Sequence, residues 1–528
     1  MDRNKEQAAE KKISVERGKQ GVLKVIFGRT AIIIGIIIVQ LLILLWGFSY
    51  VQKYIVYAYG VYQFVMVLIV LYIINRPGTP EFKLSWIVPI LGIPIFGGLF
   101  YLFVNAQIGG KILNRRLTSL EKVTKPYVQP DPELMKEIRE KDEEVANLAH
   151  YLETHGNYPA FKNSVVKYFS SGEEKFEELK LQLRKAKKFI FLEYFIVQSG
   201  EMWDTVLDIL KEKVAEGVEI RFMYDGTCTL ALLPYQYPKL MESFGIQCKV
   251  FAPIRPALTT SQNNRDHRKI LVIDGKTAFT GGINLADEYI NKKERFGYWK
   301  DTAVMVRGEA VRSFTNMFLQ MWNIDREGEN YSKYLECDGY LGAYGSPGYV
   351  IPYGDSPLDK ENVGELVYLD MIYSAKRYVH IMTPYLILDQ QMIVALTFAA
   401  KRGVDVSIVM PHIPDKVYAF ALAKTYYPEL IAAGVKIYEF EPGFIHAKNF
   451  VVDDVKATVG TINLDFRSLY LHFECGLYMF EGPQIADIEQ DFQHTLAQCL
   501  PITLADCKNI SIWMKIIGKG LRLFAPLM

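Results

Sequence analysis

The first hundred residues are dominated by long apolar stretches. Three stretches of 21 residues carry no charge, and they cover residues 31–51, 54–74 and 84–104. At about 1.5 Å per helical residue, each is long enough for the roughly 30 Å hydrocarbon core of a bilayer. Pro89 and Pro94 interrupt the third stretch, so we expect it to kink or to dip into the membrane without crossing. The pattern predicts a transmembrane helical region over residues 30–105, behind a basic tail at 1–29.

The charges that flank these stretches give two signals about orientation. Eight Lys and Arg residues in the first 29 place the N-terminus in the cytoplasm by the positive-inside rule. A second basic group, between Lys111 and Lys125, follows the third stretch and favours the same side. Three full crossings cannot satisfy both signals, whereas a re-entrant third stretch can. The sequence predicts a multi-pass membrane protein and leaves open the side on which the rest of the chain lies.

Beyond a charged, helix-forming connector at residues 106–160, short apolar runs alternate with amphipathic segments, and this order occurs twice. We expect strands at 189–197, 217–226 and 245–253, and again at 378–387, 403–412 and 434–442, with helices at 202–216 and 390–402. A Gly/Pro/Ser-rich run at 338–349 separates the copies. Since strand–helix–strand order implies parallel strands flanked by helices, we predict two tandem α/β lobes, 161–345 and 346–528.

Composition narrows the choice of partner. Sixty Lys and Arg residues balance 59 Asp and Glu residues, giving a net charge of +1. Because nucleic-acid affinity comes largely from neutralised phosphates, this balance argues against a nucleic-acid partner. The six cysteines show no paired spacing typical of zinc sites.

A duplicated motif carries the candidate chemistry. "RDHRKILVIDGKTAFTGGINLAD" in the first lobe and "FIHAKNFVVDDVKATVGTINLD" in the second place the same residue types at the same spacing. The matched positions are His267, Lys269, Asp274, Gly281 and Asn284, and His446, Lys448, Asp453, Gly460 and Asn463. Residues two apart on a strand point to the same face, so each His and Lys share a face, and the Gly turn brings the Asn close to it.

Two such sets facing each other across a pseudo-two-fold axis would surround one phosphate. One His can attack phosphorus while the other protonates the leaving oxygen, and Lys269, Lys448, Asn284 and Asn463 would meet the charge on the phosphoryl oxygens. We expect no metal and no cofactor, because the Lys beside each His would repel a cation. The remaining histidines outside the motifs, His150, His155, His380, His472 and His494, are interpreted as ordinary partly buried residues; His412, at a strand's C-terminal end, could line a pocket.

The duplicated H-x-K-x4-D-x6-G-[GST]-x-N pattern resembles that of the phospholipase D superfamily, over most of residues 161–528. Within it, "NNRDHRKILVIDGKTAFTGGINLADEY", "FGYWKDT", "GTINLDFRSLYLHFE" and "RLFAPLM" are similar to bacterial cardiolipin synthases. One departure is Gly282, where many members carry Ser. The resemblance implies two phospholipase D-like lobes, with mixed sheets flanked by helices, in a bacterial cell membrane. It also implies a phosphatidyl transfer between two phosphatidylglycerol molecules that yields cardiolipin and glycerol through a phosphatidyl-histidine.

The resemblance further implies that Asp301 and Glu474 orient the imidazoles. Asp274 and Asp453 complete the motif and count among the catalytic candidates, although capping the local turn is the role that we favour. We take His267 as the nucleophile and His446 as the general acid, following the superfamily. Two alternatives stay open: a phospholipase D-type phosphodiesterase with water as acceptor, and a catalytically silent membrane scaffold.

Overall fold

The computed structural model describes residues 35–43, 55–93, 96–105, 108–234, 236–254, 263–336, 346–359 and 361–527. The chain forms two compact units. The larger unit comprises residues 112–253 and 264–519, and it contains most of both predicted α/β lobes. The smaller comprises residues 1–111, 254–263 and 520–528.

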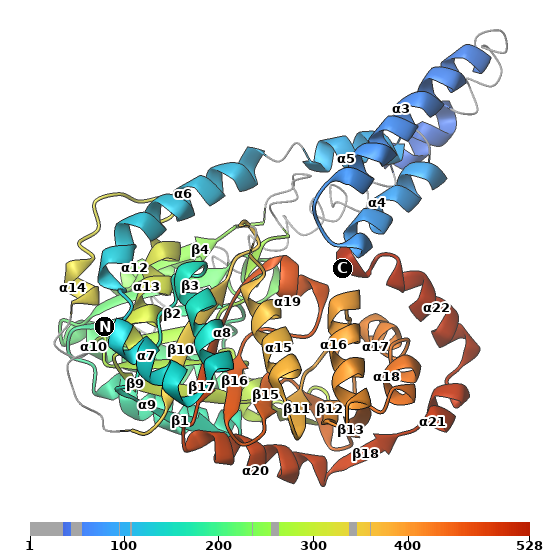
Figure 1. Ribbon diagram of the computed structural model, residues 1–528. Coiled ribbons are helices and arrows are strands. Elements are labelled where there is room, and N and C mark those ends of the chain that lie inside the picture. Colours follow the sequence, from blue (N-terminus) through green and yellow to red (C-terminus); the bar gives the residue numbers. More distant parts are fainter. Residues whose placement is uncertain are drawn as a thin grey trace. The chain divides into compact units, whose positions relative to one another are not determined.

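The first lobe is built on a seven-stranded mixed sheet with strand order β1-β9-β7-β6-β2-β3-β4 (Figure 1). Strands β2, β3 and β4 are parallel, and the other neighbours are antiparallel. Its elements are β1 (Ser164–Phe169), α9 (Gly172–Arg184), β2 (Phe189–Tyr194), α10 (Glu201–Ala215), β3 (Glu219–Asp225), α11 (Cys228–Ala231), α12 (Tyr237–Ser243), β4 (Gln247–Phe251), β5 (Arg265–Asp266), β6 (Ile270–Ile273), β7 (Thr277–Gly281), η3 (Asp287–Ile290), β8 (Tyr298–Lys300), β9 (Ala303–Gly308), α13 (Val311–Trp322) and α14 (Ser332–Leu335).

The second lobe repeats this order as β10-β17-β16-β15-β11-β12-β13 and adds β18 at the edge. The expected strand–helix–strand segments are therefore present in both lobes. The elements are β10 (Tyr349–Asp355), α15 (Val363–Ser374), β11 (Tyr378–Met382), α16 (Gln390–Lys401), β12 (Asp405–Pro411), α17 (Val417–Ala423), α18 (Tyr427–Ala432), β13 (Lys436–Phe440), β14 (Gly443–Ile445), β15 (Asn449–Val452), β16 (Lys456–Gly460), α19 (Phe466–Tyr470), β17 (His472–Phe480), α20 (Gln484–Leu496), β18 (Cys499–Ile502), α21 (Leu504–Asn509) and α22 (Ile512–Arg522).

Helices cover both faces of the second sheet. Tyr368 of α15 stacks on Phe450 of β15, with ring centroids 4.0 Å apart. Phe492 of α20 stacks on His380 of β11 at 4.4 Å. His380 pairs with Val451, the neighbour of Phe450, and adjacent strand residues point to opposite faces. Helices α15 and α20 therefore lie on opposite faces of this sheet (Figure 1).

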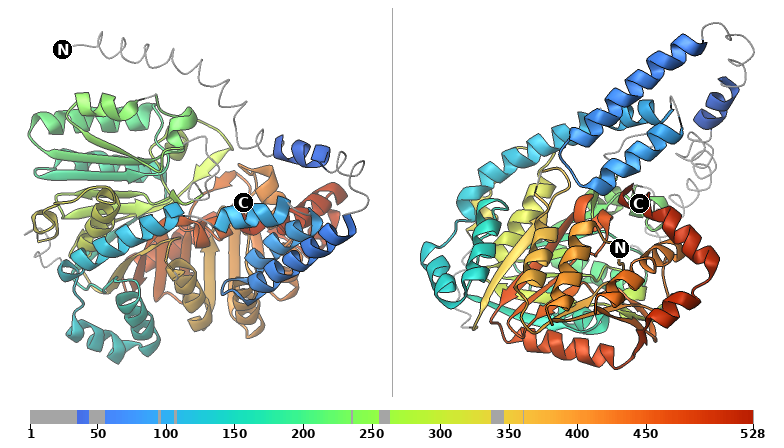
Figure 2. Two further views of the ribbon diagram at one scale, coloured as in Figure 1. Left: turned by 90° about the horizontal axis from the view of Figure 1, so that it is seen from above. Right: turned by 45° about the vertical axis from the view of Figure 1, so that its right-hand side comes forward.

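The two lobes share one hydrophobic core. Buried residues of β6, β7 and β9 cluster with buried residues of β15, β16 and β17, and α13 and α20 contribute to the same cluster. The left view of Figure 2 shows the green strands of the first lobe beside the orange strands of the second. Because the core runs from one sheet to the other, the lobes are held together by apolar burial as well as by polar contacts.

The charged segment before the lobes forms helices α6 (Ile108–Thr124), α7 (Pro132–Lys141) and α8 (Glu143–Thr154), with a short turn η1 (Lys125–Tyr127) between the first two. Asp131 and Asp142 cap α7 and α8 by accepting backbone N–H groups. Leu134 and Ile138 of α7 are buried, as is the apolar face of α8. Helices α7 and α8 are therefore packed parts of the larger unit, although the composition of residues 106–160 predicts only a charged connector.

In the smaller unit, α3 (Ile55–Asn75), α4 (Pro80–Gly92), α5 (Phe96–Asn105) and η5 (Ala525–Leu527) are present. Stretch 54–74 corresponds to α3, whereas stretch 31–51 lies mostly outside the described residues. Among the described residues, no helix combines the length and the apolar character that crossing a membrane requires.

Stretch 84–104 is not one straight helix. Trp86 of α4 and Tyr101 of α5 have ring centroids 5.4 Å apart, although 15 residues of a continuous helix would separate them by roughly 22 Å. The chain therefore folds back on itself after Gly92. A Cβ atom on Gly97 would lie 2.5 Å from the carbonyl oxygen of Pro89, so the close approach of α4 and α5 requires a glycine there.

Candidate active site

Each motif histidine follows a short strand that pairs with the other lobe. Strand β5 runs parallel to β17, and the backbone N–H of His267 donates to the carbonyl of Phe473 at 2.9 Å. Strand β14 runs parallel to β8, and the N–H of His446 donates to the carbonyl of Lys300 at 2.7 Å. The two histidines are thus placed by equivalent pairings that cross between the lobes.

The side chains of the two histidines also contact the opposite lobe. Nδ1 of His267 lies 2.9 Å from both carboxylate oxygens of Glu474, and Nδ1 of His446 lies 2.6 Å from Oδ2 of Asp301. All four side chains are buried. A carboxylate that accepts from Nδ1–H leaves the lone pair on Nε2, the nitrogen that can attack or carry a proton. Each lobe therefore supplies the histidine of one pair and the carboxylate of the other.

The two motif lysines lie beside these pairs. Nζ of Lys269 donates to the carbonyl of His267 at 2.6 Å. Nζ of Lys448 donates to the carbonyl of His446 and lies 2.9 Å from its Nδ1. Burial lowers the pKa of Lys269 to about 8 and that of Lys448 to about 7, because desolvation disfavours the charged amine. The pKa values of both amines therefore lie close to neutral pH.

The surroundings of both imidazoles favour their neutral forms. Burial, and then the charges of Lys269 and Lys448, hold the pKa of His267 well below its usual range. Burial and Lys448 lower the pKa of His446 to about 4, against the opposite effect of Asp301. Burial alone would raise the pKa of Asp301, but His446 and Lys448 outweigh it and the pKa is lowered. A neutral imidazole beside a carboxylate is the form that attacks phosphorus.

Asp274 and Asp453 lie at the other ends of β6 and β15 from the histidines. The Asp274 carboxylate accepts the backbone N–H groups of residues 187–189, at 2.6 to 2.9 Å. The Asp453 carboxylate accepts those of residues 376–378, at 2.7 to 2.8 Å. Each Asp therefore fastens a turn to the start of the neighbouring strand, which favours the structural role over the catalytic one.

Asn284 and Asn463 are engaged inside their own lobes. Oδ1 of Asn284 accepts from the N–H of Ile196 at 2.9 Å, and Nδ2 donates to the hydroxyl of Tyr289 at 2.8 Å. Nδ2 of Asn463 donates to the Ser468 hydroxyl at 3.0 Å. Asn284 is fully buried. These contacts brace the turn after each Gly, so the lysines are the better candidates for phosphate contacts.

Two residues outside the motifs also lie at the site. His472 and Glu474 are two residues apart on β17, so they share a face of that strand. Trp299 of β8 likewise stands two residues before Asp301 in the sequence. The His472 ring is 5.5 Å from the His267 ring, and the Trp299 ring is 5.3 Å from the His446 ring. His472 therefore lies beside the candidate nucleophile, although the sequence alone favours an ordinary partly buried histidine at this position. Its spacing from Glu474, matched by that of Trp299 from Asp301, is the sequence signal that identifies it.

Ligand atoms of His267, His472 and Glu474 lie within 4.8 Å of one another and form a possible metal-binding group among the described residues. However, Nδ1 of His267 is already bonded to Glu474. The positive charges of Lys269 and Lys448, which act on the same imidazole, oppose a cation. The chemistry of this donor set therefore fits an anion between the lobes better than a metal.

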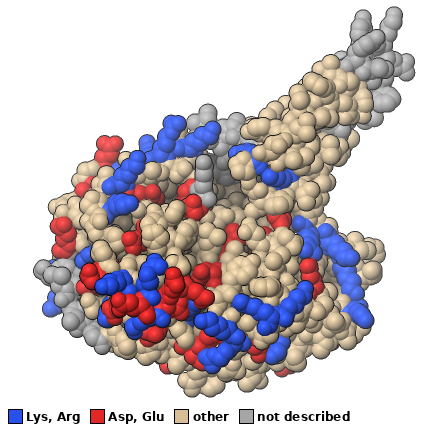
Figure 3. All heavy atoms as spheres, viewed as in Figure 1, with Lys and Arg blue, Asp and Glu red and all other residues tan. Residues whose placement is uncertain are grey.

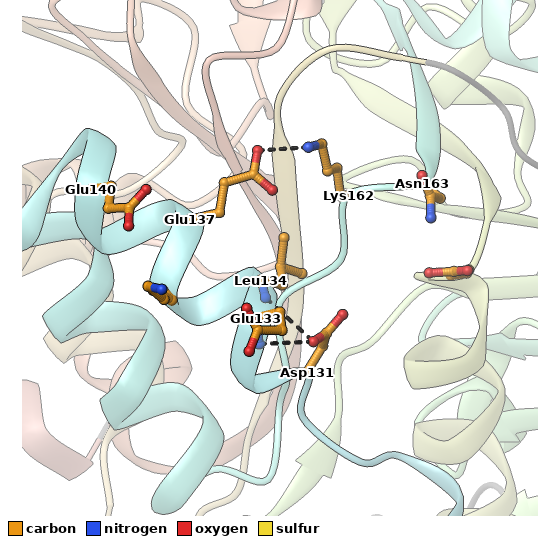
Figure 4. A pocket seen from close by; sticks show the side chains of 9 residues that line it. Asp131, Glu133, Leu134, Glu137, Glu140, Lys162 and Asn163 are labelled. Carbon is orange, nitrogen blue, oxygen red and sulfur yellow. Dashed lines mark hydrogen bonds and ion pairs between the residues drawn. The ribbon is translucent and has the colours of Figure 1, made fainter.

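A separate surface pocket of about 380 Å³ lies away from these groups (Figure 4). The carboxylate of Asp131 accepts from the backbone of α7, and Glu137 pairs with Lys162 at 2.6 Å. Three of its polar side chains are therefore used in helix capping and ion pairing, and none of its lining residues belongs to the motifs. The lining residues are Asp131, Glu133, Leu134, Lys136, Glu137, Glu140, Lys162, Asn163 and Glu309.

Comparison with known proteins agrees with this geometry. Residues 179–322 and 368–496 match the family described as "Cardiolipin synthase, PLD-like domain". A Streptococcus mutans protein whose function is not stated is 52% identical over 87% of this chain and 99% of its own length. A protein of Alkalihalophilus pseudofirmus named cardiolipin synthase is 34% identical over 87% of this chain and 91% of its own length.

The solved structure of a phosphatidylserine synthase from Haemophilus influenzae matches with a TM-score of 0.55 at 15% identity, over 72% of this chain and 98% of that one. At this identity the likeness concerns the fold alone. The family match covers half of the chain, in two segments that lie in the two lobes. The chain is therefore an enzyme of the bacterial cardiolipin synthase family, within the phospholipase D superfamily.

Proposed function

We propose that the protein transfers the phosphatidyl group of one phosphatidylglycerol to another, forming cardiolipin and releasing glycerol. The observation that carries this proposal is the crosswise pairing of His267 with Glu474 and of His446 with Asp301. It supplies two oriented imidazoles, each with a carboxylate partner from the other lobe, as a two-step displacement at phosphorus needs. The names of the relatives support cardiolipin as the product.

In the first step, Nε2 of His267 attacks phosphorus. The nitrogen–phosphorus bond forms, and the bond from phosphorus to the oxygen of the headgroup glycerol breaks. His446 gives its proton to that oxygen, and free glycerol leaves. His446 must first gain this proton, and an anionic phosphodiester in the site favours the gain because it offsets the charges of Lys269 and Lys448. In the second step, His446 takes the proton of the acceptor hydroxyl, whose oxygen attacks phosphorus and releases His267.

The lysines balance the charge of the phosphoryl oxygens in both steps. Their lowered pKa values mean that a bound phosphate anion, which favours the charged amines, is needed to keep both lysines protonated at neutral pH. Glu474 and Asp301 hold the imidazole tautomers and stabilise the cationic forms that appear along the path.

We propose further that the smaller unit anchors the enzyme in a bacterial cell membrane through its apolar side chains. Apolar side chains on α3, α4 and α5 are exposed to a degree that is costly in water, among them Val61, Phe64, Leu91, Leu99 and Phe103. The full chain should then sediment with membranes and stay there after an alkaline carbonate wash. Release by carbonate would overturn the anchoring proposal without touching the chemistry.

The reaction is tested by expressing the full chain in a bacterial host that lacks cardiolipin synthases and reading its lipids. Cardiolipin supports the transferase, phosphatidate without cardiolipin supports the hydrolase alternative, and an unchanged profile supports a silent scaffold. His267→Asn and His446→Asn are the matched variants. With purified protein and phosphatidylglycerol labelled in the phosphate, acid quenching should retain label on His446→Asn and none on His267→Asn. Label on His267→Asn alone would exchange the two roles.

A further inference from the structure

His472 lies beside the His267–Glu474 pair, and no step of the proposed reaction uses it. It is the first residue of β17, and its side chain is 94% buried, with 6% of its surface exposed. Its ring lies 5.5 Å from that of His267 and 6.2 Å from that of Phe195. The side chain therefore lies next to the candidate nucleophile.

The ring nitrogens of His472 are buried without a hydrogen bond. Among the described residues, neither Nδ1 nor Nε2 has a partner at hydrogen-bonding distance, and neither atom is exposed. A buried polar group without a partner destabilises a fold. A Phe or Leu would fill the same space without this cost. A histidine at this position therefore needs an explanation other than packing.

The carboxylate of Glu474 lies close to the ring of His472. Both oxygens of Glu474 lie 2.9 Å from Nδ1 of His267. Oε2 also accepts from the hydroxyl of Thr461. The corresponding neighbour of Oε1 is Nδ1 of His472, at 3.7 Å. Catalytic hydrogen bonds often shorten when the substrate is bound.

We infer that His472 is a positioning residue for the His267–Glu474 pair. In the loaded site its Nδ1–H donates to Oε1 of Glu474, as the Thr461 hydroxyl donates to Oε2. Two donors hold the carboxylate in place and make it less basic, so that His267 stays neutral and keeps the lone pair on Nε2. This inference rests on the proposed function, because it concerns the same pair of groups.

The first lobe has no such arrangement. The residue equivalent to His472 is Trp299, whose Nε1 has no hydrogen-bond partner among the described residues. Gly282 stands at the position of Thr461 and offers no hydroxyl. Oδ1 of Asp301 accepts from the backbone of Thr302 at 2.8 Å instead. The additional side-chain donor is therefore specific to the pair that contains His267.

The prediction for pH dependence follows from the groups around His267. Those that act on it are Glu474 and His472 from β17, Lys269 from its own motif, and His446, Lys448 and Lys416 from the second lobe. His472→Phe removes a neutral donor and changes no formal charge. The carboxylate becomes more basic and favours the protonated His267, so the pKa of His267 rises and the acid limb of activity moves to higher pH.

The test measures kcat/KM against pH for the full-length wild type, His472→Phe and His472→Asn on micellar phosphatidylglycerol. We expect the acid limb of His472→Phe to move up by about one pH unit and kcat to fall roughly tenfold, with KM unchanged. In His472→Asn, Nδ2 can take the place of the imidazole Nδ1 as the donor to Glu474. Its acid limb should therefore return to the wild-type position, and its kcat should be within about threefold of wild type. His472→Leu serves if His472→Phe melts below the assay temperature.

The control is His380→Phe, which removes another buried histidine of the second lobe. His380 lies on β11, outside the motifs, and its Nδ1 is hydrogen-bonded to Glu489 of α20. It should melt at a lower temperature and keep the wild-type acid limb. The inference is overturned if the acid limb of kcat/KM stays at the wild-type pH in both His472→Phe and His472→Leu. It is also overturned if the acid limb of His472→Asn moves as far as that of His472→Phe. Absence of cardiolipin and phosphatidate with the wild type would instead overturn the proposed function, and the inference with it.

Discussion

Position 282 has no side chain, and this determines how the carboxylate of the first lobe is placed. A Cβ atom on Gly282 would lie 2.1 Å from Oδ1 of Asp301. At the equivalent position of the second lobe, the Thr461 hydroxyl donates to Glu474. In the first lobe Gly282 leaves room for the carboxylate of Asp301, whereas in the second lobe Thr461 donates to the carboxylate of Glu474. Each provides one carboxylate for an imidazole, but with different supporting contacts.

Gly282→Ala should therefore displace Asp301 from His446. The carboxylate is held by Thr302 and His446, so it cannot move away without losing one of these contacts. We expect kcat to fall on the order of 100-fold, since small misplacements of reacting groups have effects of this size. The value of kcat is measured from the steady-state rate of cardiolipin formation. Gly92→Ala is the control, because a Cβ there meets no atom within 4 Å. Wild-type kcat in Gly282→Ala would contradict this account of the pair.

The lowered pKa values predict an unusual pH profile for the wild type. His267 attacks as the neutral form, and its pKa lies well below the ordinary value, so kcat/KM should stay high on lowering the pH below 6.5. The lysines bind phosphate as cations. With pKa values of about 8 and 7, they should lose charge and activity as pH rises through that range. The measurement is kcat/KM against pH on a soluble substrate. An acid limb near pH 6.5 together with an alkaline limb above pH 9 would contradict the lowered pKa values of His267 and the two lysines.

At the level of elements, local patterns predict more than long-range partners. Short apolar runs predict strands such as β2, β3, β11 and β12, because the residues that favour a buried strand are neighbours in the sequence. The fold-back of stretch 84–104 depends on Trp86 meeting Tyr101, which hydropathy does not report. The crosswise pairs join residues 207 and 145 positions apart. Resemblance names their members, but only the pairing of β5 with β17 and of β8 with β14 shows which carboxylate meets which histidine.

Helix α22 has a packed side and an exposed apolar side. A Cβ atom on Gly518 would lie 2.5 Å from the carbonyl oxygen of Ala421, so the helix touches α17 through this glycine. Ile512, Trp513, Ile516 and Ile517 are exposed instead. Basic side chains lie along the edge of the molecule where α22 runs (Figure 3). An apolar face beside basic residues is typical of a helix at a membrane surface.

Replacing Trp513 and Ile517 by Ser should weaken binding to the lipid surface without disturbing the fold. Both side chains are exposed, so the melting temperature should change little. Activity on phosphatidylglycerol vesicles should fall several-fold, whereas activity on detergent-solubilised lipid should be kept, because only vesicles require surface binding. Lys508→Ser, an exposed change on the preceding helix, is the control. Equal losses on vesicles and in detergent would favour a packing role for the helix.

At the scale of the whole molecule, the larger unit contains every group that the proposed reaction uses. Its two lobes cannot act separately, because each histidine takes its carboxylate from the other lobe and the core is shared. The unit starts within α6, where Leu117 is buried in that core and Thr124 accepts from Gln320 at 2.9 Å. The chemistry and the proposed anchoring are thus assigned to different parts of the chain.

A chain shortened to residues 112–528 should therefore fold and react without the apolar helices. We expect cooperative melting, weaker binding to vesicles, and turnover of phosphatidylglycerol in mixed micelles close to that of the full chain. A chain that starts at Lys125 is the matched comparison. It lacks Leu117, and removal of a buried leucine side chain destabilises a protein by about 2–5 kcal/mol, so it should melt at a lower temperature. If residues 112–528 melt cooperatively and yet form neither cardiolipin nor a labelled histidine, the N-terminal helices must complete the lipid site, and their proposed role as an anchor alone is wrong.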